Sequence, residues 1–414
     1  MGASNQVSQP QALAGIRICD FTGQLAGAGA TKWLAAFGAE VIRIEDPVRD
    51  GRWDILRGNA PFKPEQAGLD YGGAFNNHNV GKQGITLNLR NDRAKQILKE
   101  LIEISDVVAE NFAAGVLEKW GFGYPQLKAI KQDIIYASNC GFGHTGPYRE
   151  FKTWGPIVQA VSGLTHSSAL PGQPPAGWGY SYMDHTGGYY MAMAIMLALL
   201  HRDNTGQGQW VDLACTEAAT TLNGPALLDW SVNQRRMETP DANRSQYKPM
   251  APHGIYPCAG DDHWIAVSCR DELEWQALAR VINQPWTAEF ETLAQRLARQ
   301  DALDAALAAW TQSQDKLVLQ DLLRSLPIPA AAVLKPRERI DQQPFTREFG
   351  LWPGVDHSAM GPTEVDGQPV HFSRTEWQAP HGGPCLSEHT RSVLTTLLDY
   401  SDDDVTMLYE EGVL

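Results

Sequence analysis

The chain has 414 residues, of which 43% are hydrophobic, 20% charged and 9% aromatic, a composition that excludes the disordered and fibrous classes. Its 34 basic and 48 acidic residues give a formal charge of −14, so we expect neither nucleic acid nor an anionic membrane as a partner. An anionic substrate would need a local cluster of basic residues. Because single hydrophobic cores stop growing at about 250 to 300 residues, we expect a chain of this length to form two structural lobes.

Cysteine usage and the terminal sequence indicate a cytoplasmic protein. The six cysteines lie far apart and form no CxxC pair, which is typical of a reducing compartment. The N-terminal residues are polar and lack the basic start and apolar stretch of a signal peptide. The most apolar segment, Tyr189 to Leu200, has 12 residues, well short of the roughly 20 that span a bilayer.

The N-terminal part alternates apolar runs with helical patterns. Residues 15–21 and 39–46 are predicted strands, and a helix is predicted within 23–37, after the glycines. Such a βαβ unit implies a parallel sheet. After an irregular stretch over 47–76, the pattern continues with further predicted strands and helices at 85–89, 91–104 (a helix opened by Asn91), 105–111, 125–131 and 133–139. We therefore expect an α/β, Rossmann-like domain.

The middle of the chain begins with a loop rich in glycine and proline over 141–180. The segment 187–202 follows as a helix that is apolar on nearly all faces, so we expect it to lie inside the protein. Residues 210–214 are a predicted strand.

From about residue 245 the pattern becomes antiparallel. A hairpin is predicted from 254–258 and 263–269, and a helix is predicted to start at Asp271. The later elements are a helix at 317–326, a strand at 330–334, an irregular stretch at 337–375 and two C-terminal helices with start signals at Ser401 and Asp402. The predicted domains are a large Rossmann-like domain over 1–225, a linker over 226–244, an inserted small α+β domain over 245–335, and a return to the large domain over 336–414.

Two glycine-rich turns follow predicted strands. Gly23, Gly27 and Gly29 could let a phosphate approach the start of a helix, or could serve tight helix packing alone. The segment 141–146 matches GxGxxG, but Pro147 follows at once and no helix starts there. We interpret 141–146 as a loop of close approach and not as a dinucleotide site.

Asp184 stands before the predicted apolar helix, in the segment YMDHTGG. An aspartate in this position is usually an N-cap. The helix start would also keep a carboxylate ionised in apolar surroundings, where it could act as a nucleophile. From the residues alone both interpretations stay open, and the N-cap is favoured.

No metal site is predicted. The mixed set His253, Cys258, His263 and Cys269 lacks the usual zinc spacings. Motifs for a GxSxG elbow, an HExxH site and a Walker loop are also missing from the sequence.

Taken together, the segments resemble class III coenzyme A transferases, the family of formyl-CoA and carnitine CoA transferases. The resemblance extends along the whole chain, through GIRICDFTGQLAGAGATKWLAAFGAEVIRIEDP, HNVGKQGITLNL, SDVVAENFAAGVLEKWGFGY, IIYASNCGFGHTGPY, SYMDHTGGYYMAMAIMLALLHRDNTGQGQWVDLA, APHGIYPCAGDDHWIAV and LSEHTRSVLTTLL. It implies an interlocked, ring-shaped homodimer and no permanently bound cofactor. Its substrates would be an acyl-CoA and a carboxylic acid.

The resemblance also implies roles for particular residues. Asp184 matches the family nucleophile, which forms an aspartyl anhydride and then an aspartyl-CoA thioester. The implied CoA contacts are Gln24, Leu25, Ala26, Lys82, Asn111, Phe112, Lys119 and Cys140. Leu25 and Cys140 stand where formyl-CoA transferases have glutamine and lysine, and SQYKPMAP at 245–252 replaces their glycine run.

Three alternatives stay open. An α-methylacyl-CoA racemase would need a histidine where this chain has Trp154, although His144 and His185 lie nearby in sequence. A non-catalytic CoA-binding subunit is disfavoured by the intact Asp184. A nicotinamide oxidoreductase lacks its fingerprint context.

Overall fold

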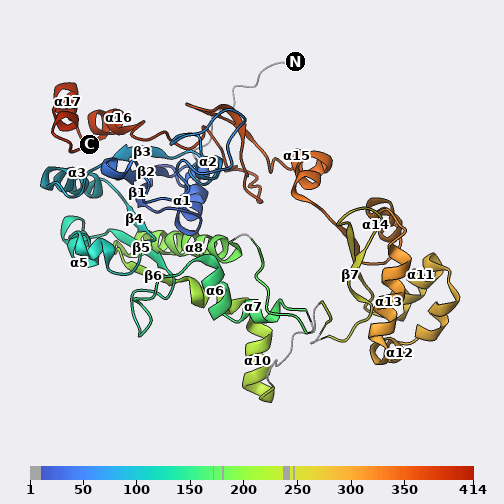
Figure 1. Cartoon of the computed structure of the whole chain (residues 1–414). Helices are drawn as coiled ribbons and strands as arrows, with labels where there is room; N and C mark the ends of the chain where they lie inside the picture. Colours follow the sequence, from blue (N-terminus) through green and yellow to red (C-terminus); the bar gives the residue numbers. More distant parts are fainter. Residues whose placement is uncertain (1–10, 171, 180, 236–242, 246–247) are drawn as a thin grey trace. The chain divides into compact units, whose positions relative to one another are not determined.

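The computed structural model describes residues 11–170, 172–179, 181–235, 243–245 and 248–414. The chain forms two compact units (Figure 1). Unit 1 comprises Met1–Leu164, Gly177–Asn223 and Phe345–Leu414, and unit 2 comprises Thr165–Ala176 and Gly224–Pro344. The domain boundaries predicted at 225, 245 and 335 stay predictions.

Unit 1 is built on a six-stranded, fully parallel sheet, which confirms the predicted α/β class. Its strand order is β3-β2-β1-β4-β5-β6. The strands are β1 (Arg17–Phe21), β2 (Glu40–Glu45), β3 (Gln83–Thr86), β4 (Val107–Glu110), β5 (Ile135–Cys140) and β6 (Trp210–Ala214). The order changes direction between β1 and β4, and ligands of such sheets bind at the carboxyl ends of the strands beside this point.

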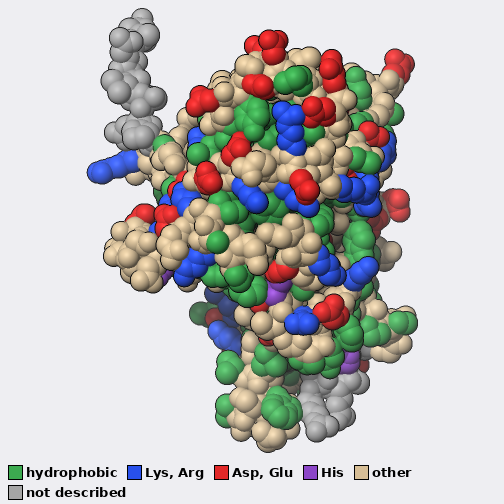
Figure 2. All heavy atoms as spheres, turned by 90° about the vertical axis from the view of Figure 1, so that its left-hand side faces the viewer, with side chains coloured by type: hydrophobic (Ala, Val, Ile, Leu, Met, Phe, Trp, Pro, Cys, Tyr) green, Lys and Arg blue, Asp and Glu red, His purple; other side chains and the backbone are tan. Residues whose placement is uncertain are grey.

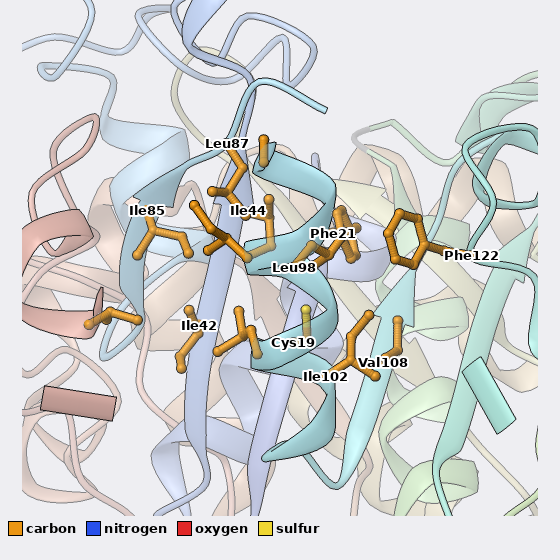
Figure 3. Close-up of a cluster of buried hydrophobic side chains, with 14 of the residues drawn as sticks. Cys19, Phe21, Ile42, Ile44, Ile85, Leu87, Leu98, Ile102, Val108 and Phe122 are labelled. Carbon is orange, nitrogen blue, oxygen red and sulfur yellow. The ribbon is translucent and has the colours of Figure 1, made fainter. Parts of the chain in front are cut away.

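Helices cover both faces of the sheet (Figure 1). Alternate strand residues point to opposite faces, so Phe21 and Ile42 pack beneath Leu98 of α3 in Figure 3, whereas Ile18 and Val41 join the core under α1 and α8. The first face carries α3 (Asp92–Glu103), α5 (Tyr124–Ile130), α16 (Thr390–Leu397) and α17 (Asp402–Glu410); the second carries α1 (Ala26–Ala36) and α8 (Tyr182–Thr205). The predicted caps Asn91 and Ser401 are confirmed, because each side chain accepts a backbone N–H of its own helix.

Helix α8 differs from its prediction in two ways. It begins at Tyr182, five residues before the predicted start, because Gly187 and Gly188 serve close packing inside the helix and do not interrupt it. Its apolar surface is also only partly covered in this chain. Met191 and Ile195 are fully buried, whereas Leu197 is 67% exposed and Leu200 is 58% exposed.

Unit 2 contains an antiparallel three-stranded sheet in the order β7-β8-β9. Its strands are β7 (His253–Pro257), β8 (Trp264–Ser268) and β9 (Ala330–Val333), and its helices are α10 (Gly224–Asn233), α11 (Glu272–Ile282), α12 (Leu293–Ala298), α13 (Gln300–Thr311) and α14 (Lys316–Arg324). The predicted hairpin and the cap at Asp271 are confirmed. None of the helices in the described part of either unit is long and apolar enough to cross a membrane.

Several short elements lie in stretches that were predicted to be irregular, or beside predicted elements. They are α2 (Gly73–His78), α4 (Val116–Lys119), α6 (Gly155–Val161), α7 (Leu164–Ser167), α9 (Cys215–Thr221), α15 (Pro344–Glu348), β10 (Gly354–His357) and β11 (Gly361–Glu364). Most of them begin with or contain glycine or proline, which the sequence pattern assigns to loops. Pro156 is favourable in the first turn of α6, because a helix needs no backbone N–H donor there.

On the face drawn in Figure 2, basic and acidic side chains are intermixed over most of the area.

Candidate active site

The turn between β1 and α1 is fixed by one side chain from the end of β4. The Asn111 side-chain oxygen accepts the Gly23 N–H at 2.7 Å, and its amide nitrogen donates to the Gly23 carbonyl at 3.1 Å. A Cβ atom at position 27 would lie 2.5 Å from the Asn111 side chain, so Gly27 makes this approach possible. The turn itself is Gln24, in the left-handed region at φ 54°, followed by buried Leu25 and Ala26.

Phe112 lies beside this clamp and forms one wall of a cavity in unit 1. Its ring packs against Trp53 at 5.1 Å and Trp120 at 5.4 Å between ring centres. The cavity measures about 550 Å³ and includes Phe21, at the carboxyl end of β1, in its lining. Cationic side chains also line it, namely Arg49, Arg90, Lys95 and Lys119.

An aromatic wall and several cations suit an anionic ligand with a flat ring. Of the residues predicted from the sequence, Phe112 and Lys119 meet in this cavity. Trp53, Arg49 and Arg90 were not predicted, because Trp53 and Arg90 lie in loops and Arg49 ends a three-residue 3-10 helix (Pro47–Arg49), all without a periodic pattern. Their only signal in the sequence is that each follows a predicted strand of a parallel sheet.

Helix α8 lies very close to the same β1–α1 turn. A Cβ atom at position 188 would be 2.8 Å from the Ala26 carbonyl oxygen, so only glycine allows this spacing without a shift. Asp184 precedes Gly188 by one helical turn and therefore lies on the same side of α8. The side of α8 that carries Asp184 therefore packs against the turn formed by Gln24, Leu25 and Ala26.

The prediction that Asp184 is the N-cap of this helix is wrong. Ser181 is the cap residue, and Asp184 is the third residue within the helix. Burial raises the pKa of the Asp184 carboxyl group, while a hydrogen bond from Ser181 and the nearby His185 act in the opposite direction. A desolvated carboxylate is less stable as an anion than one in water, and so is a better nucleophile.

Asp184 also packs directly against the start of α6. A Cβ atom at position 155 would lie 2.8 Å from Asp184 Oδ2, so Gly155 leaves just enough room for the carboxylate. Below α8, Cys215 Sγ donates to Asn139 Oδ1 at 2.9 Å, and position 187 is glycine because a Cβ there would be 2.7 Å from that sulfur.

Two other predicted site residues are held by the protein itself. Lys82 is fully buried, and its ammonium group donates to Asp20, Ala28 and Asn79 at 3.0 to 3.2 Å. Burial lowers its pKa to about 8. Cys140 ends β5 with its sulfur 3.7 Å from His144 Nδ1, and burial raises the pKa of its thiol to about 12.

Two further sequence features can be placed. The described residues contain no group of three His, Cys, Asp or Glu side chains that could hold a metal ion. In the segment SQYKPMAP, residues 246 and 247 lie outside the described residues, and the segment belongs to unit 2.

Residues 13–390 match the model of CoA-transferase family III. The chain belongs to this family. It is 32% identical to the formyl-CoA:oxalate CoA-transferase of Rhodopseudomonas palustris (strain BisA53), over 98% of this chain and 97% of the relative. It is 29% identical to the succinyl-CoA–D-citramalate CoA-transferase of Chloroflexus aurantiacus, with 98% of each chain covered.

The fold comparison agrees. A crystal structure of a CAIB/BAIF family protein from Brucella suis matches with a TM-score of 0.82 at 26% identity, over 94% of this chain and 100% of that one. The family inferred from the sequence and the enzyme class are thereby confirmed.

Proposed function

We propose that this family III CoA-transferase moves CoA from an acyl-CoA donor to a carboxylate acceptor, with Asp184 as the covalent nucleophile. The observation that carries the proposal is the placement of Asp184. Its carboxylate is partly desolvated, contacts Gly155, and lies on the side of α8 that packs against the turn at Ala26. The titratable neighbour on α8 is His185, and burial lowers the pKa of this ring, so no strong ion pair with it holds the carboxylate in its ground state.

In the proposed reaction, an Asp184 carboxylate oxygen attacks the thioester carbonyl and CoA leaves as a thiolate, which gives a mixed anhydride on Asp184. The thiolate then attacks the aspartyl carbonyl of the anhydride, so that aspartyl-CoA forms and the donor acid leaves. The acceptor carboxylate attacks aspartyl-CoA, and the same two steps run in reverse to give the new acyl-CoA. Every step exchanges one activated acyl bond for another, and water must be excluded because each intermediate hydrolyses.

For CoA we propose a path from the cavity to Asp184. The nucleotide would occupy the cavity beside Phe112, with Lys119, Arg49 and Arg90 near its phosphates, because charge-assisted contacts to phosphate are strong. Pantetheine would then cross the turn at Gln24, Leu25 and Ala26. Asn111 would act on this path through the Gly23 backbone, and buried Lys82 through the scaffold of the turn. Cys140 would stay a neutral thiol behind the site.

A trapping experiment tests the nucleophile. Incubation with an acyl-CoA and then hydroxylamine should convert Asp184 to a hydroxamate, detected by mass spectrometry of the peptide that contains it. Asp184→Asn should lose both the modification and turnover, by about 10⁴-fold or more in kcat. Asp203→Asn, at the far end of the same helix, is the matched control. Turnover that survives in Asp184→Asn would refute the assignment.

Substrates can be screened by liquid chromatography of CoA esters. The relatives' names supply the first candidates, with formyl-CoA and succinyl-CoA as donors and oxalate and D-citramalate as acceptors. Deuterium entering the α-carbon of an acyl-CoA without any acceptor would identify racemase activity instead.

We also propose that the protein is a homodimer, as the family resemblance implies. The support is the uncovered apolar side of α8, where Leu197 and Leu200 are exposed together with Tyr189, Met193 and Met196. Light scattering after size-exclusion chromatography should give about twice the chain mass of 45.6 kDa. A monomer at micromolar concentration would contradict the proposal.

A further inference from the structure

A buried carboxyl group supports the turn that carries Asn111 and Phe112. Glu110 ends β4 and is 1% exposed. Its Oε2 accepts the Phe112 backbone N–H at 2.7 Å, and its Oε1 accepts the Tyr136 hydroxyl at 3.1 Å. Oε1 also lies 3.5 Å from His144 Nε2. The Glu110 side chain therefore fixes the Asn111–Phe112 turn, in which Asn111 holds Gly23 and Phe112 forms one wall of the cavity.

His144 connects Glu110 to a second carboxylate on β6. Its Nδ1 is 3.3 Å from Asp212 Oδ1, and its backbone N–H donates to both oxygens of Asp212 at 3.0 Å. The imidazole thus lies between two carboxyl groups, one on each ring nitrogen. The β5–α6 loop is held to β6 by the same contacts.

This array has room for one shared proton. Either the Glu110 carboxyl O–H donates to a neutral His144 ring, or an imidazolium ring donates to both carboxylates. The two forms have the same protons and the same net charge of about −1. If that proton is lost, the Nε2 lone pair faces the Glu110 carboxylate, and a second uncompensated negative charge is buried.

We propose that Glu110 is a positioning residue for CoA, and that the proton it shares with His144 holds the Asn111–Phe112 turn in its binding geometry. This inference rests on the proposed function. When the proton leaves, the repulsion between His144 and Glu110 loosens the support of the Phe112 peptide. CoA then binds more weakly although Asp184 is untouched.

The surroundings of Glu110 set the pH range of the effect. Burial is the main cause that raises the pKa of Glu110 to about 8, and the charges of Glu118 and Asp212 add to it. Burial also raises the pKa of Tyr136, so this phenol stays protonated. The titratable groups that face the array are therefore Tyr136, Cys140, His144, Asp212 and Glu118. Buried Lys82 titrates in a similar range on another element, so a variant is needed to separate the two.

The test is the dissociation constant of CoA at pH 7 and pH 9, measured by calorimetry with the full chain. One pH unit above its midpoint the array keeps its proton in about a tenth of the molecules, so the wild-type Kd should rise about tenfold. Glu110→Gln keeps an acceptor for the Phe112 N–H and places an N–H toward His144, and its amide does not titrate. The Kd of this variant should therefore rise by less than about threefold between pH 7 and pH 9. Exposed Glu103→Gln on α3, whose charge is not among those that raise the pKa of Glu110, is the matched control and should keep the tenfold ratio.

A second variant covers the case in which Glu110→Gln does not fold. Asp212→Asn removes the negative charge that helps to hold the proton, so the rise in Kd should begin at lower pH than in the wild type. An unchanged ratio in Glu110→Gln, or an unchanged midpoint in Asp212→Asn, would overturn the inference and assign the effect to another group such as Lys82. Equal wild-type affinity at both pH values would also overturn it. A wild-type chain that does not bind CoA at pH 7 would instead refute the proposed function.

Discussion

Replacing Gly155 with alanine should displace the Asp184 carboxylate without disturbing the fold. Gly155 is the first residue of α6, and its backbone does not have a positive φ, so alanine is compatible with its conformation. The added Cβ would lie 2.8 Å from Asp184 Oδ2 and 3.2 Å from Cγ. The three atoms nearest to the added Cβ all belong to the Asp184 carboxylate, which must therefore move.

The displacement can be estimated from these distances. Ordinary van der Waals contacts begin near about 3.4 Å, so the 2.8 Å separation requires a shift of about 0.6 Å. Misplacing a reacting group by about 1 Å can cost about 10²-fold in rate. We therefore expect kcat to fall about 10- to 100-fold, which corresponds to about 1.4 to 2.7 kcal/mol of barrier. Alanine is more favourable than glycine in a helix by at most about 1 kcal/mol, so the free energy of unfolding should stay near the wild-type value.

The assay is kcat by chromatography of CoA esters, together with CoA affinity and urea unfolding. Because the cavity that we propose for CoA is not altered, the Kd of CoA should stay within about twofold. Gly354→Ala is the matched control, since a Cβ there has no neighbour within 4 Å. A Gly155→Ala enzyme with wild-type kcat would show that the position of the Asp184 carboxylate does not limit the reaction.

Two further predictions concern the clamp and the pH dependence of stability. Asn111→Ala removes both hydrogen bonds to Gly23, so the free energy of unfolding should fall by about 2 kcal/mol and the Kd of CoA should rise. Urea titration measures the free energy of unfolding, and calorimetry measures the Kd. The control is exposed Asn204→Ala, which should leave the Kd unchanged. Burial lowers the pKa of His78 to about 4, so the folded chain keeps this ring neutral while the unfolded chain binds a proton below about pH 6.5. Stability from His78 is therefore present above pH 6.5 and lost as the pH falls toward 4, by at most about 3 kcal/mol, and His78→Gln should show a smaller loss between pH 7 and 4.5 in urea unfolding. Equal losses in the two proteins would contradict this account.

Local patterns in the sequence were sufficient for the strands of the parallel sheet and for most long helices. The caps at Asn91, Asp271 and Ser401 could be predicted because a cap depends on hydrogen bonds within three residues. The short helix α6 could not, since Gly155 and Pro156 indicate a loop unless a neighbouring group such as the Asp184 carboxylate is known.

The family was also available from the sequence, through the order and spacing of the motifs along the whole chain, and the role of Asp184 that these motifs imply stays a prediction. Only the tertiary structure showed what surrounds that carboxylate and which residues line the cavity that we propose for CoA. Sheet register places Glu110 beside Phe21, and Asp212 beside Ser138, although these pairs are separated by more than seventy residues. The contacts of Asn111 with Gly23, of Gly188 with Ala26 and of His144 with Asp212 arise from this packing. Such contacts depend on distances between elements, and the periodicity of a single element carries no information about them.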